Sequence, residues 1–200
     1  MTNVRNYTDI ELIERVEKLP SFKGWKKGIT DVWVRSNEDA YNKFDDKVYT
    51  FECLNDGERP KFIMVCSGTT NAGVQGLKNF EKYGRASGCA VAVADYICYD
   101  SHVYGLHGKS QYPAYIQRLD KGEQYPYTRD NDKDEKSENY GKIYTDRIGM
   151  NCHRASQSID LEEIGLYSVA CLVRNKVSQW KKWLAFMNKR KLTVCILNEF

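Results

Sequence analysis

The chain has 200 residues, a formal net charge of +3 at pH 7 and a hydrophobic content of 42%. This length can bury a substantial core, so folding does not require a disulfide framework or a structural metal. The small positive charge is spread along the chain, which argues against a nucleic-acid-binding protein. No apolar run reaches the ~18 residues of a membrane-spanning helix, so no membrane span is predicted.

The first element expected in chain order is a helix over residues 8–19. Thr8 and Glu11 have the spacing of a capping box, apolar residues follow at helical intervals, and Pro20 ends the segment. Segments rich in Val, Ile, Tyr and Phe, separated by Gly, Asn and Asp, then predict strands at 31–35, 47–53, 61–66 and 89–99.

The second half of the chain predicts a loop, a helix and a strand. Residues 120–141 are polar and charged, which is typical of an exposed loop. Residues 176–191 predict an amphipathic helix, because Val177, Trp180 and Leu184 fall on one face, and residues 192–197 predict a strand. No linker divides the chain, so we expect a single domain over residues 1–200 of the α+β class, mainly β.

The cysteine content argues against several kinds of site. Most of the seven cysteines lie in apolar, strand-like runs, where a reduced cysteine packs as a small hydrophobic residue. No two of them form a CxxC pair, which excludes a zinc ribbon or a thioredoxin-like redox site. About five of the seven are expected to be buried free thiols of a protein kept in a reducing compartment.

One cysteine follows a candidate base closely in the sequence. His153 lies in the segment Met-Asn-Cys-His-Arg, and Cys171 ends the segment Ser-Val-Ala-Cys eighteen positions later. A thiol becomes a good nucleophile when a neighbouring base removes its proton. Cys171 is therefore a candidate nucleophile, and His153 is the candidate base that would return the proton to a leaving amine. Cys152 would point to the opposite face of a strand and belong to the core.

The other two histidines receive different interpretations. His107 is flanked by Gly105 and Gly108, and such glycines allow close approach of the backbone to another group. We expect His107 to line a substrate groove, and the alternative is a turn histidine with a local hydrogen bond. His102 follows Asp100 and Ser101 and is expected at the surface.

Two loops resemble ligand-binding motifs but lack required residues. Asp130, Asp132 and Asp134 alternate as in a calcium loop, yet Gly141 occupies the twelfth position, where a glutamate is needed. Residues 67–73 form a turn-rich loop that lacks the Gly-Lys-Ser/Thr sequence at the end of a P-loop. The expectations are a solvated acidic loop, a structural turn, and neither a metal nor a cofactor.

The pattern of His153, fourteen intervening residues, Ser168 and Cys171 resembles the active-site signature of L,D-transpeptidase catalytic domains. Those domains carry a His-Gly pair where this chain has Val169-Ala170, and Arg174 lies one position later than their usual arginine. The resemblance implies a β-rich sandwich or barrel, a thioester acyl-enzyme, and peptidoglycan stem peptides as substrate.

A wider similarity to phage- and prophage-borne relatives spans about residues 65–175. It rests on the order of Thr69-Thr70-Asn71-Ala72-Gly73, Gly105-Leu106-His107-Gly108, Gln117, Arg129-Asp130-Asn131, Gly149-Met150-Asn151-Cys152-His153-Arg154 and Ser168-Val169-Ala170-Cys171. The resemblance implies that the catalytic residues are Cys171, His153 and Ser168. It implies that the substrate-binding residues are His107, Gly108, Asn151, Arg154 and Arg174.

The expected function is therefore a cysteine-dependent transpeptidase or peptidase of peptidoglycan, with a phage as one expected source. One alternative is a non-catalytic virion or wall-binding protein that keeps the fold, which the departure at Ala170 favours. Another is a cytosolic thiol hydrolase of a small amide. The N-terminal segment has no apolar signal region, so we expect synthesis in the cytoplasm and delivery to a cell wall or a phage particle by another route. The expected partners are stem peptides and phage virion proteins.

Overall fold

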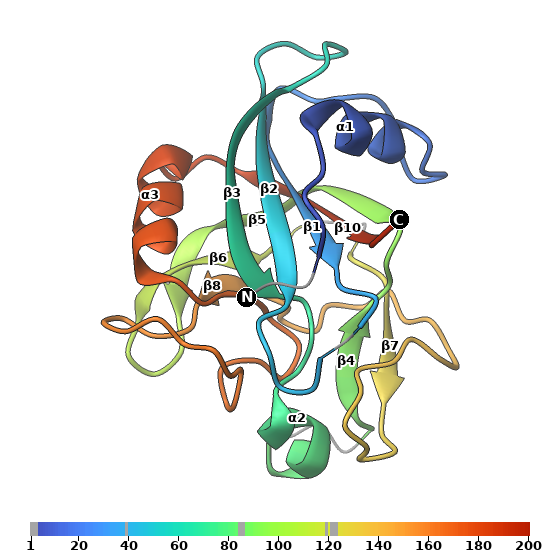
Figure 1. Ribbon diagram of the computed structural model, residues 1–200, viewed down its shortest axis with the longest axis vertical. Helices are drawn as coiled ribbons and strands as arrows, with labels where there is room; N and C mark the ends of the chain where they lie inside the picture. Colours follow the sequence, from blue (N-terminus) through green and yellow to red (C-terminus); the bar gives the residue numbers. More distant parts are fainter. Residues whose placement is uncertain (1–3, 39, 84–86, 119, 121–123) are drawn as a thin grey trace.

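The main sheet of the computed structural model closes on itself as a barrel (Figure 1). The model describes residues 4–38, 40–83, 87–118, 120 and 124–200. Within these residues the order of the barrel strands is β1 (Gly28–Arg35), β10 (Leu192–Asn198), β5 (Tyr96–His107), β6 (Tyr112–Gln117), β8 (Cys152–Arg154), β9 (Leu172–Arg174), β3 (Lys61–Thr69) and β2 (Asp46–Cys53). Most neighbouring pairs are antiparallel, whereas β1–β10 and β8–β9 are parallel.

The remaining elements lie outside the barrel. These are α1 (Asp9–Glu17), α2 (Val74–Asn79), the 3₁₀ helix η1 (Phe80–Tyr83), α3 (Val177–Met187), and the two-stranded sheet of β4 (Cys89–Ala92) and β7 (Tyr127–Asp130). The capping box predicted at the start of α1 is present. The Thr8 hydroxyl accepts from the Glu11 N–H, and the Glu11 carboxylate accepts from the Thr8 N–H. None of the described helices is long and apolar enough to cross a membrane.

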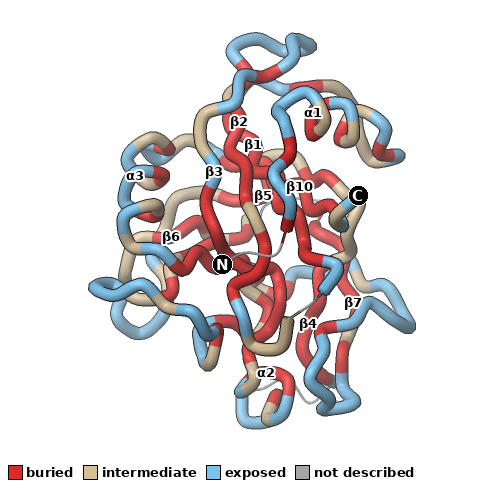
Figure 2. The backbone as a smooth tube through the Cα atoms, in the orientation of Figure 1, coloured by how far each residue is buried: buried red, intermediate tan, exposed pale blue. Residues whose placement is uncertain are grey.

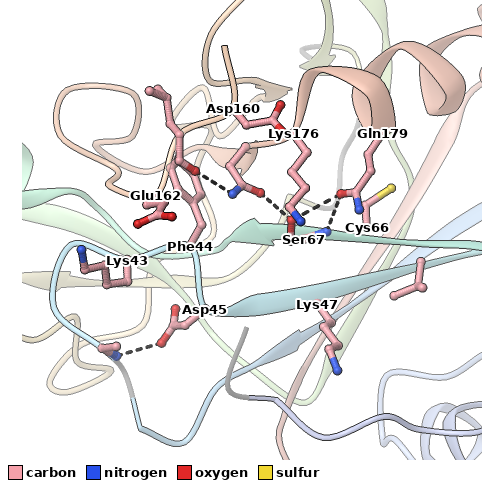
Figure 3. A pocket seen from close by; sticks show the side chains of 14 residues that line it. Lys43, Phe44, Asp45, Lys47, Cys66, Ser67, Asp160, Glu162, Lys176 and Gln179 are labelled. Carbon is pink, nitrogen blue, oxygen red and sulfur yellow. Dashed lines mark hydrogen bonds between the residues drawn. The ribbon is translucent and has the colours of Figure 1, made fainter. Parts of the chain in front are cut away.

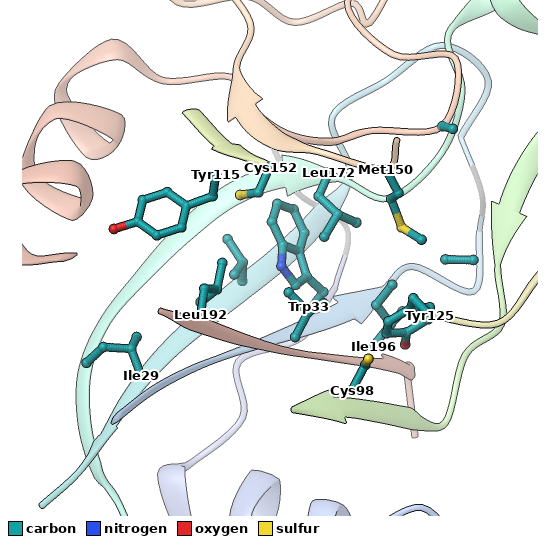
Figure 4. Close-up of a cluster of buried hydrophobic side chains, with 14 of the residues drawn as sticks. Ile29, Trp33, Cys98, Tyr115, Tyr125, Met150, Cys152, Leu172, Leu192 and Ile196 are labelled. Atoms are coloured by element: carbon teal, nitrogen blue, oxygen red, sulfur yellow. The ribbon is translucent and has the colours of Figure 1, made fainter. Parts of the chain in front are cut away.

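Alternation along the strands divides the apolar residues between two faces of the barrel wall. In β10, Leu192, Val194 and Ile196 join one buried cluster, whereas Cys195 and Leu197 join another. This two-residue period is the geometric property of a strand. Figure 4 shows the first cluster, which fills the barrel; the second lies between the barrel wall and α1. Figure 2 shows the same division: the barrel strands are mostly buried, and the connecting loops are largely exposed.

The α3 helix adds aromatic side chains to the barrel core. Trp180, Trp183 and Met187 are buried on its inner face and belong to the same cluster as the barrel interior. The predicted helix over 176–191 is therefore confirmed as an amphipathic element, shorter by a few residues at its C-terminal end. The αL conformation of Asn188, with φ of 42°, ends it.

The α+β, mainly β class is confirmed, and two local predictions are wrong. The segment 89–99 contains two strands, β4 and the start of β5, because Asp95 adopts a positive φ of 57° between them. The segment 120–141 is not an exposed loop throughout, because β7 pairs with β4 and buries Tyr127, Thr128 and Asp130. Residues 121–123 of that segment lie outside the described residues.

Candidate active site

The parallel pairing of β8 with β9 brings His153 and Cys171 together. The register pairs Cys152 with Leu172, and the Leu172 N–H donates to the Asn151 carbonyl at 2.9 Å. Cys171 directly precedes β9, so it lies beside the start of β8. The separation of eighteen residues in sequence is thus closed by one pair of neighbouring strands.

The hairpin of β5 and β6 brings a second imidazole and a phenol to the same place. The register pairs His107 with Tyr112 across a turn in which Gly108 and Gln111 have positive φ values of 69° and 49°. Gly108 is exposed and accepts the Gln111 N–H at its carbonyl, so it shapes the turn. The sequence does not predict Tyr112 as a site residue. Recognition of a β-hairpin over residues 107–112 would have placed it opposite His107.

Three side chains of the site converge on one point. His107, His153 and Cys171 each offer a nitrogen or sulfur atom, and these atoms lie within 4.8 Å of one another. The two imidazole rings are stacked, with centroids 4.4 Å apart and an interplanar angle of 17°. His153 is buried, whereas His107 and Cys171 are half-buried. Cys171 is therefore partly accessible to solvent, whereas the His153 ring beside it is buried.

Hydrogen bonds fix the tautomer of His153. Its Nδ1 lies 2.8 Å from the Arg154 carbonyl, which can only accept, so Nδ1 carries the hydrogen and Nε2 carries the lone pair. Nε2 is buried and has no hydrogen-bond partner among the described residues. Burial lowers the pKa of His153 to about 3, which keeps the ring neutral near pH 7. Nε2 of the imidazole is therefore unprotonated and available to accept a hydrogen.

The Tyr112 hydroxyl also contacts Nδ1 of His153 and leaves Nε2 untouched. Its oxygen lies 3.2 Å from Nδ1 of His153 and accepts a share of the same hydrogen. Burial raises the pKa of Tyr112 to about 12, so the phenol stays protonated. The guanidinium of Arg154 lies 4.5 Å from the centre of the Tyr112 ring. Arg154 is half-buried, and its cationic group lies against Tyr112, which contacts His153.

Ser168 shapes the turn that presents Cys171. Its hydroxyl donates to the Cys171 carbonyl at 2.9 Å, and its own carbonyl accepts the Gly73 N–H at 3.0 Å. A Cβ atom at Gly73 would lie 2.3 Å from the Gly165 carbonyl oxygen, so only glycine fits there. The turn-rich loop 67–73 is accordingly a support for the segment 164–171, as the structural interpretation of that loop expected.

The structure does not bring Arg174 to the thiol. Its side chain is fully buried inside the barrel, where it pairs with Asp31 at 2.6 Å and donates to the Cys152 sulfur at 2.8 Å. Cys152 is itself fully buried, with a pKa raised by burial to about 12. This confirms that Cys152 and His153 point to opposite faces of β8. Six of the seven cysteines are buried, and Cys171 is half-buried.

Two residues position the loop that leads into β8. The Gln117 side-chain oxygen accepts the N–H groups of Gly149 and Met150 at 2.8 and 2.9 Å. His102 donates from Nε2 to the Met150 carbonyl at 2.6 Å and is fully buried. The expectation that His102 lies at the surface is therefore wrong, because β5 extends through it and turns its ring into the barrel. The sequence assigns no role to Gln117, although this residue is part of the wider similarity.

A hollow of about 900 Å³ lies apart from these catalytic candidates (Figure 3). Polar groups of Ser67, Asn175 and Gln179 line it, with the Ser67 hydroxyl 2.6 Å from the Asn175 amide oxygen. Phe44 and Leu161 also line it; Phe44 belongs to a small apolar cluster, and Leu161 and Cys171 both pack against that cluster. The hollow therefore shares Phe44 and Leu161 with the apolar surroundings of Cys171, but Cys171 itself does not line it.

Among the residues that the structure describes, two groups of side chains have donor atoms close enough to hold a metal ion. The first is His107, His153 and Cys171, whose imidazole and thiolate donors would suit zinc. The second is the exposed set Asp132, Asp134 and Glu138, whose carboxylates suit a hard cation. Exposed acidic groups commonly gather without an ion, so this set carries no metal assignment.

Comparison with protein-family models, with curated proteins and with solved structures finds no match for this chain.

Proposed function

We propose that this protein is a cysteine-dependent, peptidoglycan-modifying enzyme with a divergent L,D-transpeptidase-like fold. One observation carries the proposal: the half-buried Cys171 thiol lies within 4.8 Å of a nitrogen of a neutral, buried imidazole, His153. A nucleophile beside a base that a third group orients is the common arrangement of covalent catalysis. Here the orienting group is the Arg154 carbonyl, which fixes the His153 tautomer.

The first half of the reaction forms a thioester. Nε2 of His153 takes the proton of the Cys171 thiol, and the sulfur attacks the carbonyl carbon of a peptide bond in the stem. The C–S bond forms while the carbonyl π pair moves to oxygen. The tetrahedral intermediate then collapses, the C–N bond breaks, and Nε2 returns the proton to the departing amine.

The second half releases the acyl group. Water or an acceptor amine loses a proton to Nε2 as it attacks the thioester carbonyl, the C–S bond breaks, and the thiolate regains the proton. Water gives hydrolysis, and an amine gives a new cross-link. The two outcomes use the same residues and differ only in the acceptor.

Two features of the chain support a peptide substrate at this thiol. The guanidinium of Arg154 over Tyr112 offers a cation to a carboxylate of the stem peptide. Leu106, Leu166 and Tyr167 are exposed apolar residues on the hairpin and turn that flank the site. Leu166 and Tyr167 lie in the turn that leads to Cys171 and offer exposed apolar surface to a peptide chain there, whereas Leu106 precedes His107 in β5 and faces the other side of that strand.

The Ala170 departure does not block the thiol. Ala170 is buried and belongs to the core cluster that also contains Met150 and Cys152. Its methyl group therefore packs inward, and its φ is negative, so the position does not require glycine. This weakens the main argument for a non-catalytic wall-binding or virion protein.

The direct test is incubation of purified peptidoglycan with the protein, followed by separation of the muropeptides. We expect stem peptides to be shortened or cross-linked, and Cys171→Ala to abolish the change. Cys53→Ala removes one sulfur from a buried cysteine of β2 and should retain activity. Added amine acceptor separates transfer from hydrolysis. Unchanged muropeptides with the wild type, or equal conversion by Cys171→Ala, would contradict the proposal and favour the non-catalytic alternative.

A further inference from the structure

We propose that His107 is a second catalytic imidazole, which donates a hydrogen bond from its Nε2–H to the oxyanion formed at the carbonyl attacked by Cys171. The inference rests on the proposed function and assigns a role that the thiol–base pair leaves open. It is carried by a chain of three hydrogen-bonded residues that fixes where the His107 hydrogen lies.

The chain begins at a backbone group whose direction is unambiguous. The Gln117 N–H donates to the side-chain oxygen of Asn151 at 2.9 Å. A backbone N–H can only donate, so the atom it meets must be the amide oxygen and not the amide nitrogen. This contact therefore determines which way the Asn151 amide faces.

The amide nitrogen of Asn151 then faces His107. It lies 3.1 Å from Nδ1 of the ring, and an NH₂ group can only donate. Nδ1 must carry the lone pair, so a neutral ring holds its hydrogen on Nε2. Burial lowers the pKa of His107, which favours that neutral ring.

The two stacked imidazoles consequently have opposite tautomers. His153 donates from Nδ1 and leaves a lone pair on Nε2, whereas His107 accepts at Nδ1 and keeps a hydrogen on Nε2. Each ring therefore offers a different function beside the same thiol. The charge of one ring disfavours charge on the other, since His107 acts to lower the pKa of His153. When His153 holds the thiol proton, His107 remains neutral and keeps its N–H.

A preorganised N–H on a ring that comes within 4.8 Å of the Cys171 sulfur is the kind of group that a tetrahedral intermediate requires. Negative charge develops on the carbonyl oxygen as the C–S bond forms, and a fixed donor stabilises it without reorganisation. In this role His107 transfers no proton; it donates a hydrogen bond as the oxyanion forms and loses that contact as the carbonyl reforms.

The Asn151 anchor is held firmly enough to impose this tautomer. The Gln117 side chain accepts two N–H groups of the 149–150 segment and donates to the Gln124 side-chain oxygen at 3.0 Å. Gln117 is buried, and its backbone N–H binds the Asn151 oxygen from β6. Asn151 is therefore a positioning residue, and His107 is the group that would touch the reacting atoms.

Asn151→Asp tests the chain, because the two side chains have nearly the same shape. A carboxylate oxygen still accepts from the Gln117 N–H, but the other oxygen can only accept, so the His107 hydrogen moves to Nδ1. Nitrogen-15 NMR of the imidazoles reads the tautomer directly. We expect an unprotonated Nδ1 at His107 in the wild type and a protonated Nδ1 in Asn151→Asp. A wild-type ring protonated at Nδ1 would overturn the inference.

Two small reagents separate oxyanion stabilisation from thiol activation. Acylation of Cys171 by p-nitrophenyl acetate passes through an oxyanion, whereas alkylation by iodoacetamide does not. We expect Asn151→Asp and His107→Phe to slow acylation about 100-fold, the effect of losing one oxyanion donor, and to change alkylation only a few-fold. Asn55→Asp, which adds the same charge at an exposed turn, should alter neither rate.

These outcomes distinguish the inference from the proposed function. Equal slowing of acylation and alkylation, or no slowing of either, would show that His107 is not an oxyanion donor. Selective slowing of acylation in a protein that leaves peptidoglycan unchanged would support the role of His107 and contradict the substrate. Failure of Cys171 to react with either reagent would contradict both.

Discussion

Arg174 and Asp31 form an ion pair that is completely buried inside the barrel. A guanidinium nitrogen lies 2.6 Å from one carboxylate oxygen, and both side chains are 0% exposed. The other oxygen of Asp31 accepts from the Thr50 hydroxyl at 2.6 Å and from the Trp183 indole at 3.2 Å. The guanidinium also lies 3.9 Å from the centre of the Trp183 ring. The pair therefore belongs to the core and ties β1, β9 and α3 together.

Removal of one member of this pair should destabilise the protein. Arg174→Ala leaves the Asp31 charge buried without its partner, which typically costs about 3–5 kcal/mol of unfolding free energy. Urea unfolding followed by circular dichroism measures the loss. Arg154→Ala is the matched control, since Arg154 is half-buried; we expect a change of stability below about 1 kcal/mol but a lower kcat/KM. A stable Arg174→Ala protein with a raised KM would instead favour the substrate-binding role implied by the family resemblance.

Thiol-modifying reagents should select Cys171 among the seven cysteines. The other six are buried, and burial raises the pKa of the Cys66 and Cys152 thiols, which lowers their thiolate population. Under native conditions we expect iodoacetamide to modify Cys171 first, and all seven to react after unfolding in guanidinium. Peptide mapping by mass spectrometry identifies the modified position. Earlier modification of any buried cysteine would mean that the thiol environment is not as described.

The fold was predictable where one segment carries its own signal. The capping box of Thr8 and Glu11 and the apolar stripe of α3 specify helices locally, and the β-branched and apolar residues of β1 and β10 predict strands by composition. The three-residue strands β8 and β9 carry no such pattern. They are strands only because neighbouring strands supply hydrogen bonds, and closure of the barrel depends on partners distant in sequence.

The candidate site was predictable in part for the same reason. The spacing of His153 and Cys171 is visible in the sequence, and so are the glycines around His107. Tyr112 was missed because its role depends on the hairpin register that sets it opposite His107. Arg174 lies three positions after Cys171, yet side chains in a strand alternate, and the pleat turns it into the barrel. Proximity in sequence does not reveal which face a side chain occupies.

The contact between Gly73 and the 164–165 turn should be essential to the presentation of Cys171. An added methyl group at Gly73 would lie 2.3 Å from the Gly165 carbonyl oxygen and 2.8 Å from the Ile164 side chain. Gly73→Ala should therefore lower stability by about 1–3 kcal/mol and displace the turn that Ser168 pins. The expected readouts are a lower unfolding midpoint and slower alkylation of Cys171. Gly57→Ala is a control with open space at the added carbon, and its cost comes instead from a positive φ of 81°, which Gly73 (φ of −82°) does not have; it should lower stability and leave alkylation unchanged. Equal alkylation rates in both variants would contradict the support role.

Buried histidines should make the protein less stable in acid. Burial lowers the pKa of His102 to about 4 and that of His153 to about 3, whereas an unfolded histidine titrates near ~6.5. As pH falls below ~6.5 the unfolded chain takes up protons that the folded chain refuses, so unfolding becomes easier until the folded pKa is reached. For His102 this loss spans about pH 6.5 to 4 and amounts to about 3 kcal/mol. Asp130 acts in the opposite sense, because burial raises its pKa to about 6 and the folded state gains its proton first.

His102→Gln isolates the contribution of one histidine from these opposing effects. Glutamine can still donate to the Met150 carbonyl but does not titrate, so the variant lacks the pH-dependent loss while every carboxyl group is retained. We expect the variant to be less stable than the wild type at pH 7, because the ring's packing and its contact with Ser101 are lost. From pH 7 to pH 4, the unfolding free energy of the wild type minus that of the variant should fall by about 3 kcal/mol. Urea unfolding at a series of pH values measures this difference, in which the contributions of Asp130 and His153 cancel. A constant difference across that range would show that His102 is protonated equally readily in the folded and unfolded states, in conflict with its burial in the barrel.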